Sequence, residues 1–243
     1  MRAPIPYLAS ESLDWEEVLN TGAYRKVLSV DPDSGSETTF MRLKPGWHGP
    51  AGAHYHSGYE EALILSGDVD LNGNDLLVDW SYLYRPGGIV HGWVDLSPSG
   101  SDIVIKMGTA TDLVSVGERE HDYEYDSDHR VADGRPHIVH LRTKEQSWEP
   151  WPNAPAGAHK KSMSLDVQTS AETALLQLDE GFQGDLSLPT DRTWEFVVVQ
   201  GGMTLADGTQ FGMIDYSHRP AGSGDTVIAE AAGGCTLMIW DEP

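Results

Sequence analysis

The fold is decided by the stretch Gly52-Ala-His54-Tyr-His56-Ser-Gly-Tyr-Glu60-Glu-Ala-Leu-Ile-Leu-Ser-Gly67. His54 and His56 are two residues apart, so on a β-strand both imidazoles project from the same face. A Ser-Gly turn then leads into an apolar run, which places Glu60 at the start of the next strand. The stretch therefore predicts two strands that bring two imidazoles and one carboxylate together.

A second stretch, Tyr84-Arg-Pro86-Gly-Gly88-Ile-Val-His91-Gly-Trp93, supplies a further imidazole. Its proline and glycines favour a turn that delivers His91 to the start of a strand. Three imidazoles and one carboxylate that converge inside a barrel form a site for a borderline divalent metal. The two stretches together therefore predict a metal centre.

The two stretches resemble the two motifs of the cupin superfamily. The first motif is His-x-His, Glu three or four residues later and Gly seven residues after that Glu; the second is Pro-x-Gly-x-x-His. The matching residues here are His54, His56, Glu60 and Gly67, followed by Pro86, Gly88 and His91. The resemblance implies a jelly-roll barrel that holds one divalent transition metal (Fe, Mn, Ni or Zn) through His54, His56, Glu60 and His91.

Three positions depart from the cupin pattern. His48 and Trp80 stand where the family has glycine, and Asp95 stands where it has asparagine. These positions shape turns, so the departures leave the ligand set unchanged. Glu61 is the alternative carboxylate, but strand alternation sends only one of two neighbours inward, and the seven-residue step to the motif glycine selects Glu60.

Strand alternation extends the prediction to the wall of the pocket. If Glu60 points inward, Ala62 and Ile64 do so too, and an inward His91 predicts an inward Trp93. On this basis Glu60, acting as a base if it leaves the metal, and Trp93 are candidate catalytic residues.

Two tyrosines lie at the start of the second stretch and just before it. Tyr82 and Tyr84 share one face of their strand, and the sequence leaves open which face that is. Tyr84 is the third candidate catalytic residue, as a proton donor or an anchor for an anionic substrate; the alternative is a packed barrel aromatic. Weaker pocket candidates are Trp47, His48 and Lys106.

The chain also contains an internal repeat. At an offset of 133, the matching residues are Arg2, Ile5, Leu8, Trp15 and Glu16 with Arg135, Ile138, Leu141, Trp148 and Glu149. At an offset of 134 they are Gly67, Tyr82, Arg85-Pro86 and Gly100 with Gly201, Tyr216, Arg219-Pro220 and Gly234. Each copy reads as short strands separated by turns. The sequence thus predicts an all-β protein of two tandem cupin jelly-roll barrels, a bicupin, with a metal-binding domain at 1–112 and a second domain at 135–243.

The second copy lacks the ligands. The positions aligned with the four ligands hold Leu188 or Pro189, Thr190 or Asp191, Trp194 or Glu195, and Asp225. No histidine remains among them, so we expect a degenerate domain with an architectural role. A carboxylate site for a harder cation is the alternative.

Residues 113–134 form a predicted acidic connector between the copies. Six carboxylates alternate along it: Glu118, Glu120, Asp122, Glu124, Asp126 and Asp128. A solvated connector is the favoured interpretation and a calcium site the alternative, because no glycine stands where a tight cation loop would bend.

Composition excludes two classes of partner. Asp and Glu outnumber Lys and Arg by 38 to 16, and the resulting net charge of −22 repels nucleic acid and anionic membranes. The single cysteine, Cys235, cannot form an internal disulfide, and no apolar run is long enough to span a membrane. Without a secretory signal, the sequence predicts a cytoplasmic protein. The expected partner is a small-molecule substrate, with a homodimer left open.

The resemblance also suggests the class of reaction. Cupins with a similar ligand set include iron or manganese dioxygenases, isomerases, lyases and small-molecule sensors. We therefore expect a metal-dependent enzyme, foremost a dioxygenase that acts on a small oxygen-chelating organic substrate. The alternatives are a non-catalytic metal-binding sensor and a metal-dependent isomerase or lyase.

Overall fold

The computed structural model describes residues 2–49, 52–71, 76–116, 134–152, 154–186, 188–223 and 227–243. This part of the chain is β-structure throughout apart from two 3-10 turns, η1 (Ser10–Ser12) and η2 (Thr143–Glu145). It contains no helix that is long and apolar enough to cross a membrane. The all-β prediction is confirmed.

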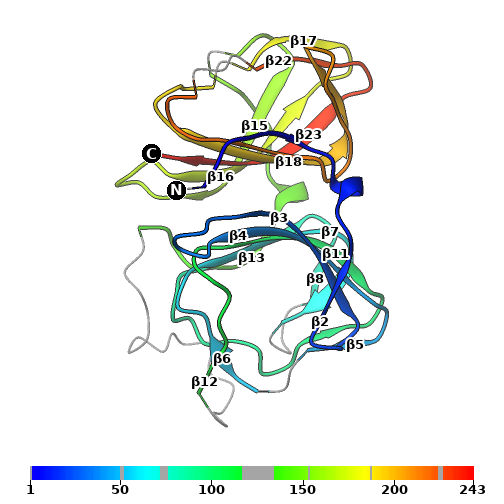
Figure 1. The fold of residues 1–243 in the computed structure, drawn as a ribbon, viewed down its shortest axis with the longest axis vertical. Coiled ribbons are helices and arrows are strands. Elements are labelled where there is room, and N and C mark those ends of the chain that lie inside the picture. Colours follow the sequence, from blue (N-terminus) through cyan, green and yellow to red (C-terminus); the bar gives the residue numbers. More distant parts are fainter. Residues whose placement is uncertain are drawn as a thin grey trace. The chain divides into compact units, whose positions relative to one another are not determined.

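The chain divides into two compact units (Figure 1). The first unit is Asp14–Lys144, and the second combines Arg2–Leu13 with Glu145–Pro243. The main sheet of the first unit has the order β13-β9-β7-β11-β4-β3-β2. These strands are β2 (Glu16–Val18), β3 (Ala23–Val30), β4 (Glu37–Leu43), β7 (Glu60–Asp70), β9 (Ser81–Arg85), β11 (Ser101–Met107) and β13 (Ile138–Arg142). Short strands complete the unit: β5 (Trp47–His48), β6 (His54–Tyr55), β8 (Leu76–Val78), β10 (Leu96–Ser97) and β12 (Val114–Ser115).

The second unit repeats this arrangement. Its main sheet has the order β1-β21-β18-β23-β16-β15-β14, which matches the first sheet strand for strand. The strands are β1 (Ile5–Leu8), β14 (Glu149–Pro150), β15 (Ala158–Leu165), β16 (Glu172–Leu178), β18 (Thr193–Gly201), β21 (Tyr216–Arg219) and β23 (Cys235–Glu242). A smaller sheet contains β17 (Phe182–Asp185), β19 (Met203–Leu205), β20 (Gln210–Phe211) and β22 (Ile228–Ala231). The common strand order supports the repeat that the sequence predicts.

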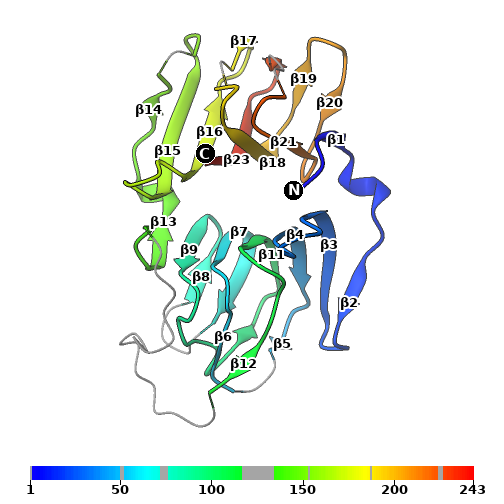
Figure 2. The same cartoon turned by 60° about the vertical axis from the view of Figure 1, so that its left-hand side comes forward.

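The first strand of each repeat joins the sheet of the other unit. β1 pairs with β21 of the second unit (Figure 2), and β13 pairs with β9 of the first. The units therefore differ from the predicted boundaries at 1–112 and 135–243, because sequence similarity aligns the two first strands without saying which sheet each one enters. Most of the predicted connector, residues 117–133, lies outside the described residues.

Two backbone positions shape turns of the first unit. A Cβ on Gly67 would lie 1.9 Å from the carbonyl oxygen of Gly100, so only glycine allows β7 and the turn before β11 to approach this closely. Trp80, where the cupin pattern has glycine, has a φ of 65° in the turn before β9. Trp80 therefore adopts the left-handed backbone conformation that glycine favours, although it replaces the glycine of the cupin pattern.

Candidate metal centre

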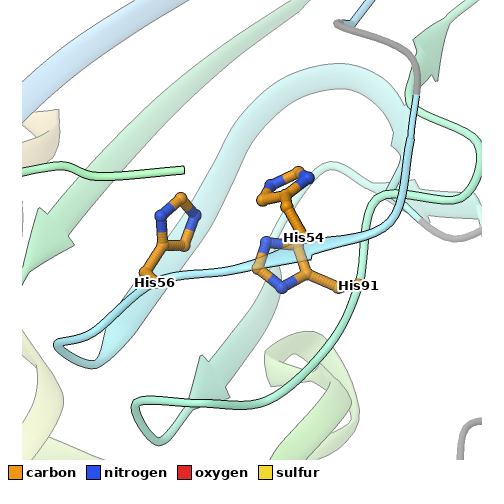
Figure 3. Close-up of side chains that lie close together, drawn as sticks. All are labelled: His54, His56 and His91. Carbon is orange, nitrogen blue, oxygen red and sulfur yellow. The ribbon is translucent and has the colours of Figure 1, made fainter. Parts of the chain in front are cut away.

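Three histidines meet in the first unit (Figure 3). His54 lies on β6, His56 directly follows this strand, and His91 follows the turn after β9. One ring nitrogen of each lies within 4.8 Å of the others, and all three residues are buried. Backbone hydrogen bonds join the two motif stretches: His54 N donates to His91 O at 2.9 Å, and His91 N donates to His54 O at 2.8 Å. The two stretches that the sequence singles out are thus paired directly.

Hydrogen bonds fix the protonated nitrogen of every ring. Nδ1 of His54 contacts Gly52 O at 3.1 Å, Nδ1 of His91 contacts Ile89 O at 2.9 Å, and Nδ1 of His56 contacts Asp112 O. A carbonyl oxygen can only accept, so each Nδ1 carries the hydrogen and each Nε2 keeps its lone pair. This is the arrangement that metal-binding histidines show, with a second hydrogen bond that sets tautomer and ring direction.

The electrostatics of the site also favour neutral imidazoles. Burial lowers the pKa of His54, and burial together with the nearby charge of Arg85 lowers the pKa of His91 well below its ordinary value. Neutral imidazole is the form that binds a metal ion, so these rings are ready to act as ligands at neutral pH.

Glu60 lies beside the histidines in an ion pair. Its Oε2 is 3.4 Å from His91 Nε2 and accepts a hydrogen bond from Arg85 Nη1 at 2.7 Å. Burial alone would raise the pKa of Glu60, but the charge and the hydrogen bond of Arg85 outweigh it and hold that pKa far below its usual range. The carboxylate is therefore ionised and lies beside one of the three imidazoles, but the group of ligand atoms within 4.8 Å of one another contains the three histidines without Glu60.

The cluster lies on the wall of a cavity of about 210 Å³ inside the first barrel. Most of its lining is apolar, and it includes Ala62 and Ile64 from the same face of β7 as Glu60. Exposed Leu19 and Leu113 also line it, which places its opening to solvent near these two residues. The predicted inward direction of Ala62 and Ile64 is confirmed.

Glu61 lies on the opposite face of β7. It is fully buried, accepts a hydrogen bond from Tyr82 Oη at 2.7 Å, and lies 3.7 Å from Arg135 Nη1. Glu60 is therefore the one of the two carboxylates that lines the cavity, and its role as a metal ligand stays a prediction.

Two predicted catalytic residues do not belong to the cavity. Tyr84 stacks on Tyr59 with ring centroids 5.5 Å apart, and the guanidinium of Arg135 lies 5.2 Å from the Tyr84 ring centroid. Tyr84 is thus a buried aromatic on the face of β9 opposite Arg85, and its catalytic assignment is wrong. Trp93 is half-buried and is not among the lining residues either, because Gly92 (φ 80°) follows His91 in a turn, so strand alternation does not apply.

The sequence interpretation missed Arg85 and used Asp95 only as a departure from the cupin pattern. Arg85 pairs in register with Glu60, one strand position from Tyr84, and points into the cavity. Its cross-strand register with Glu60 identifies it in the structure, but spacing in the sequence does not give that register. Asp95 also lines the cavity.

The interior of the second unit is filled with apolar side chains. Leu188 and Trp194, at positions aligned with ligands, pack in or against its core, and Trp194 Nε1 donates to Pro189 O at 3.1 Å. Glu195 forms a buried ion pair with Arg2 at 2.9 Å. Among the residues that the structure describes, the first unit has the one cluster able to hold a metal; Asp225 lies outside them.

The fold and the site define a class of protein. An all-β jelly-roll with histidines on two adjacent motif stretches inside the barrel is the cupin fold, as the sequence predicts. The three buried histidines could hold a metal ion.

Comparison with known proteins agrees with this class. Residues 6–111 match the family described as "ChrR Cupin-like domain", and a search of curated proteins found no match. A solved structure of a "putative dioxygenase" from Nostoc punctiforme is 17% identical, with a TM-score of 0.76 over 97% of this chain and 81% of that chain. Oxalate decarboxylase from Bacillus subtilis is 13% identical, with a TM-score of 0.63 over 99% of this chain and 76% of that chain. At these identities the likeness shows the fold.

Proposed function

We propose that the chain is a metal-dependent bicupin enzyme, a non-haem iron or manganese dioxygenase that acts on a small oxygen-chelating organic substrate. The observation that carries the proposal is the set of three buried imidazoles with free Nε2 atoms on the wall of an apolar cavity. Three neutral imidazoles with ring nitrogens within 4.8 Å of one another are a donor set that a borderline divalent metal prefers.

His54, His56 and His91 would hold the metal, with Glu60 as the fourth ligand. When bound, the metal would polarise and orient the oxygen atoms of the substrate as a Lewis acid. Three nitrogens and a carboxylate suit iron, manganese, nickel or zinc, and four protein ligands leave room for a chelating substrate on a six-coordinate ion.

The residues of the chain have their own roles in this proposal. Arg85 keeps Glu60 ionised and fixes its direction, as an outer partner does for a metal-binding carboxylate. The apolar lining excludes water and strengthens electrostatic interactions inside the cavity. The second unit, with its filled interior, would act as scaffold.

Metal analysis and oxygen consumption test the proposal. Protein purified without added metal is analysed for its elements, and the loaded protein is screened for oxygen uptake with diketones, catechols and thioether acids. Iron or manganese together with uptake is the expected result. Absence of uptake across the screen with any bound metal would contradict a dioxygenase.

A metal-binding sensor is the second candidate, because the three histidines could hold a metal ion without catalysing a reaction. Zinc bound without turnover would favour it. An isomerase or lyase would use the same ligands and would show turnover without oxygen uptake.

A further inference from the structure

Two polar atoms of the cavity lining have no hydrogen-bond partner among the described residues. They are Trp47 Nε1, a donor, and Asp95 Oδ1, an acceptor, and both are shielded from solvent. Buried polar groups almost always find a partner, so an unpaired donor and an unpaired acceptor in one cavity indicate a ligand group that pairs with them.

The two side chains lie at one end of the barrel. Trp47 belongs to β5, which pairs with β10 directly after Asp95, and Gly49 N donates to Asp95 O at 2.9 Å. A Cβ on Gly49 would lie 2.8 Å from Trp47 Cη2 and 3.0 Å from Asp95 Oδ2, so both side chains reach the same backbone position. Glycine at residue 49 leaves the space that lets them approach each other.

The same end of the cavity adjoins the histidine cluster. A Cβ on Gly92 would lie 2.6 Å from His54 Nδ1 and 3.4 Å from Asp95 Oδ2. Asp95 and His54 thus lie against the same backbone position, and Trp47 lines the same cavity as both.

We propose that Trp47 and Asp95 form a subsite that recognises a hydroxyl group on a neutral, mainly apolar substrate. The indole N–H would donate to the hydroxyl oxygen, and the Asp95 carboxylate would accept its hydrogen. A hydroxyl group satisfies both protein atoms at once, whereas an ether oxygen can only accept and a carboxylate would face the Asp95 charge. The inference rests on the proposed function for its second anchor, the metal, and adds the class of substrate.

The charges around the subsite agree with a neutral ligand. Burial, with Glu60 and Asp70 adding to it and Arg85 opposing it, raises the pKa of Asp95 to about 7. Two arginines line the described cavity, and both are paired: Arg85 with Glu60, and Arg25 with Glu16 and Glu37. Neither is left unpaired for an anionic substrate. The remaining lining is largely apolar and suits the body of an alcohol or a phenol.

A matched pair of probes tests the subsite in the metal-free full-length chain at pH 8. Dissociation constants of 4-fluorophenol, 4-fluoroanisole and 4-fluorobenzoate are measured by fluorine NMR, without a metal ion that could bind the phenol itself. We expect 4-fluorophenol to bind about tenfold or more tightly than 4-fluoroanisole, because a hydrogen bond to a charged group has this effect. Equal affinities, or tighter binding of 4-fluorobenzoate, would overturn the proposal.

Variants assign the preference to the two side chains. Asp95→Leu should reduce the ratio of the affinities for 4-fluorophenol and 4-fluoroanisole to near one. Trp47→Phe, which keeps an aromatic ring, should reduce this ratio severalfold. Asp95→Asn tests the same point with an isosteric side chain if the leucine variant fails to fold. Val78→Ala, at an exposed side chain of the first unit outside the cavity lining, is the control that should keep the wild-type ratio. An unchanged ratio in both Asp95→Asn and Trp47→Phe would overturn the subsite.

Zinc binding is measured on the same proteins, so that the two proposals can fail separately. A preference for phenol in a chain that binds no metal would support the subsite and contradict the metal-dependent enzyme. Zinc binding without a preference for phenol would overturn the subsite alone.

Discussion

Replacing Gly92 with alanine should disrupt the metal site through a single contact. A Cβ on Gly92 would lie 2.4 Å from His54 Cε1 and 2.6 Å from its Nδ1, and real Cβ atoms essentially never come closer than 3.0 Å. The imidazole must therefore rotate away and lose its 3.1 Å contact with Gly52 O. Loss of an outer hydrogen bond alone costs about 10–100-fold in metal affinity. Because a ligand moves as well, we expect zinc to bind about 100-fold more weakly or worse.

Backbone strain needs a separate control, because Gly92 has a φ of 80° and alanine is disfavoured there by about 1–2 kcal/mol. Gly222 also has a φ of 80°, and a Cβ on it would meet nothing within 4 Å. Gly222→Ala should therefore lose similar stability and keep full zinc affinity. Zinc affinity is measured by competition with a chelator and stability by urea unfolding. Wild-type zinc affinity in Gly92→Ala would refute the assignment of His54 as a ligand.

Three further predictions follow from the other contacts. Glu60→Gln should lower the metal content. Glu61→Gln should keep the metal but lower the free energy of unfolding by about 3 kcal/mol, because it breaks a buried ion pair. Loss of metal in Glu61→Gln alone would reverse the assignment of the two carboxylates. Folded Asp95 keeps its proton up to about pH 7 while the unfolded carboxyl releases it near pH 4, so this residue lowers stability as pH rises across that range, by at most about 4 kcal/mol. Asp95→Asn should remove that slope in urea unfolding, and an unchanged slope would contradict the raised pKa. The full chain should bind one transition-metal ion, and a metal-to-chain ratio near two would contradict the filled second barrel.

The histidine cluster could be predicted because each ligand lies in a short motif. His54 on β6 and His56 directly after it both line the cavity, and Pro86 and Gly88 stand in the turn before His91. Local geometry of this kind depends on a few neighbouring residues, so spacing is enough to specify it.

Strand alternation worked where a strand continues and failed where it ends. Along β7 it places Glu60 inside the cavity and Glu61 outside it, as expected. It failed for Trp93 because Gly92 turns the chain, and it left Tyr84 undecided because no side chain of known direction was available on β9. Arg85 would have supplied that direction through its register with Glu60, but register between strands far apart in sequence cannot be read from spacing.

The exchanged strands β1 and β13 suggest why both copies kept a buried ion pair while the second copy lost its metal ligands. In the first unit Arg135, from the region of β13, lies 3.7 Å from Glu61, which binds Tyr82. In the second unit the aligned residues form a similar cluster, since Arg2 donates to Glu195 at 2.9 Å and to Tyr216 Oη at 3.4 Å. Each buried pair ties the segment of an exchanged strand to the sheet that receives it.

These pairs lie on one face of β7 and β18, and the ligand positions lie on the other. Alternation makes the two faces independent, because a change at one residue leaves the direction of its neighbour unchanged. Trp194 could therefore replace a carboxylate inside the second barrel while Glu195 kept its ion pair with Arg2. Loss of the metal ligands is compatible with an intact fold for this reason. The reverse change, loss of Glu61 or Glu195, would leave a buried arginine without its counter-charge and would destabilise the unit that holds it.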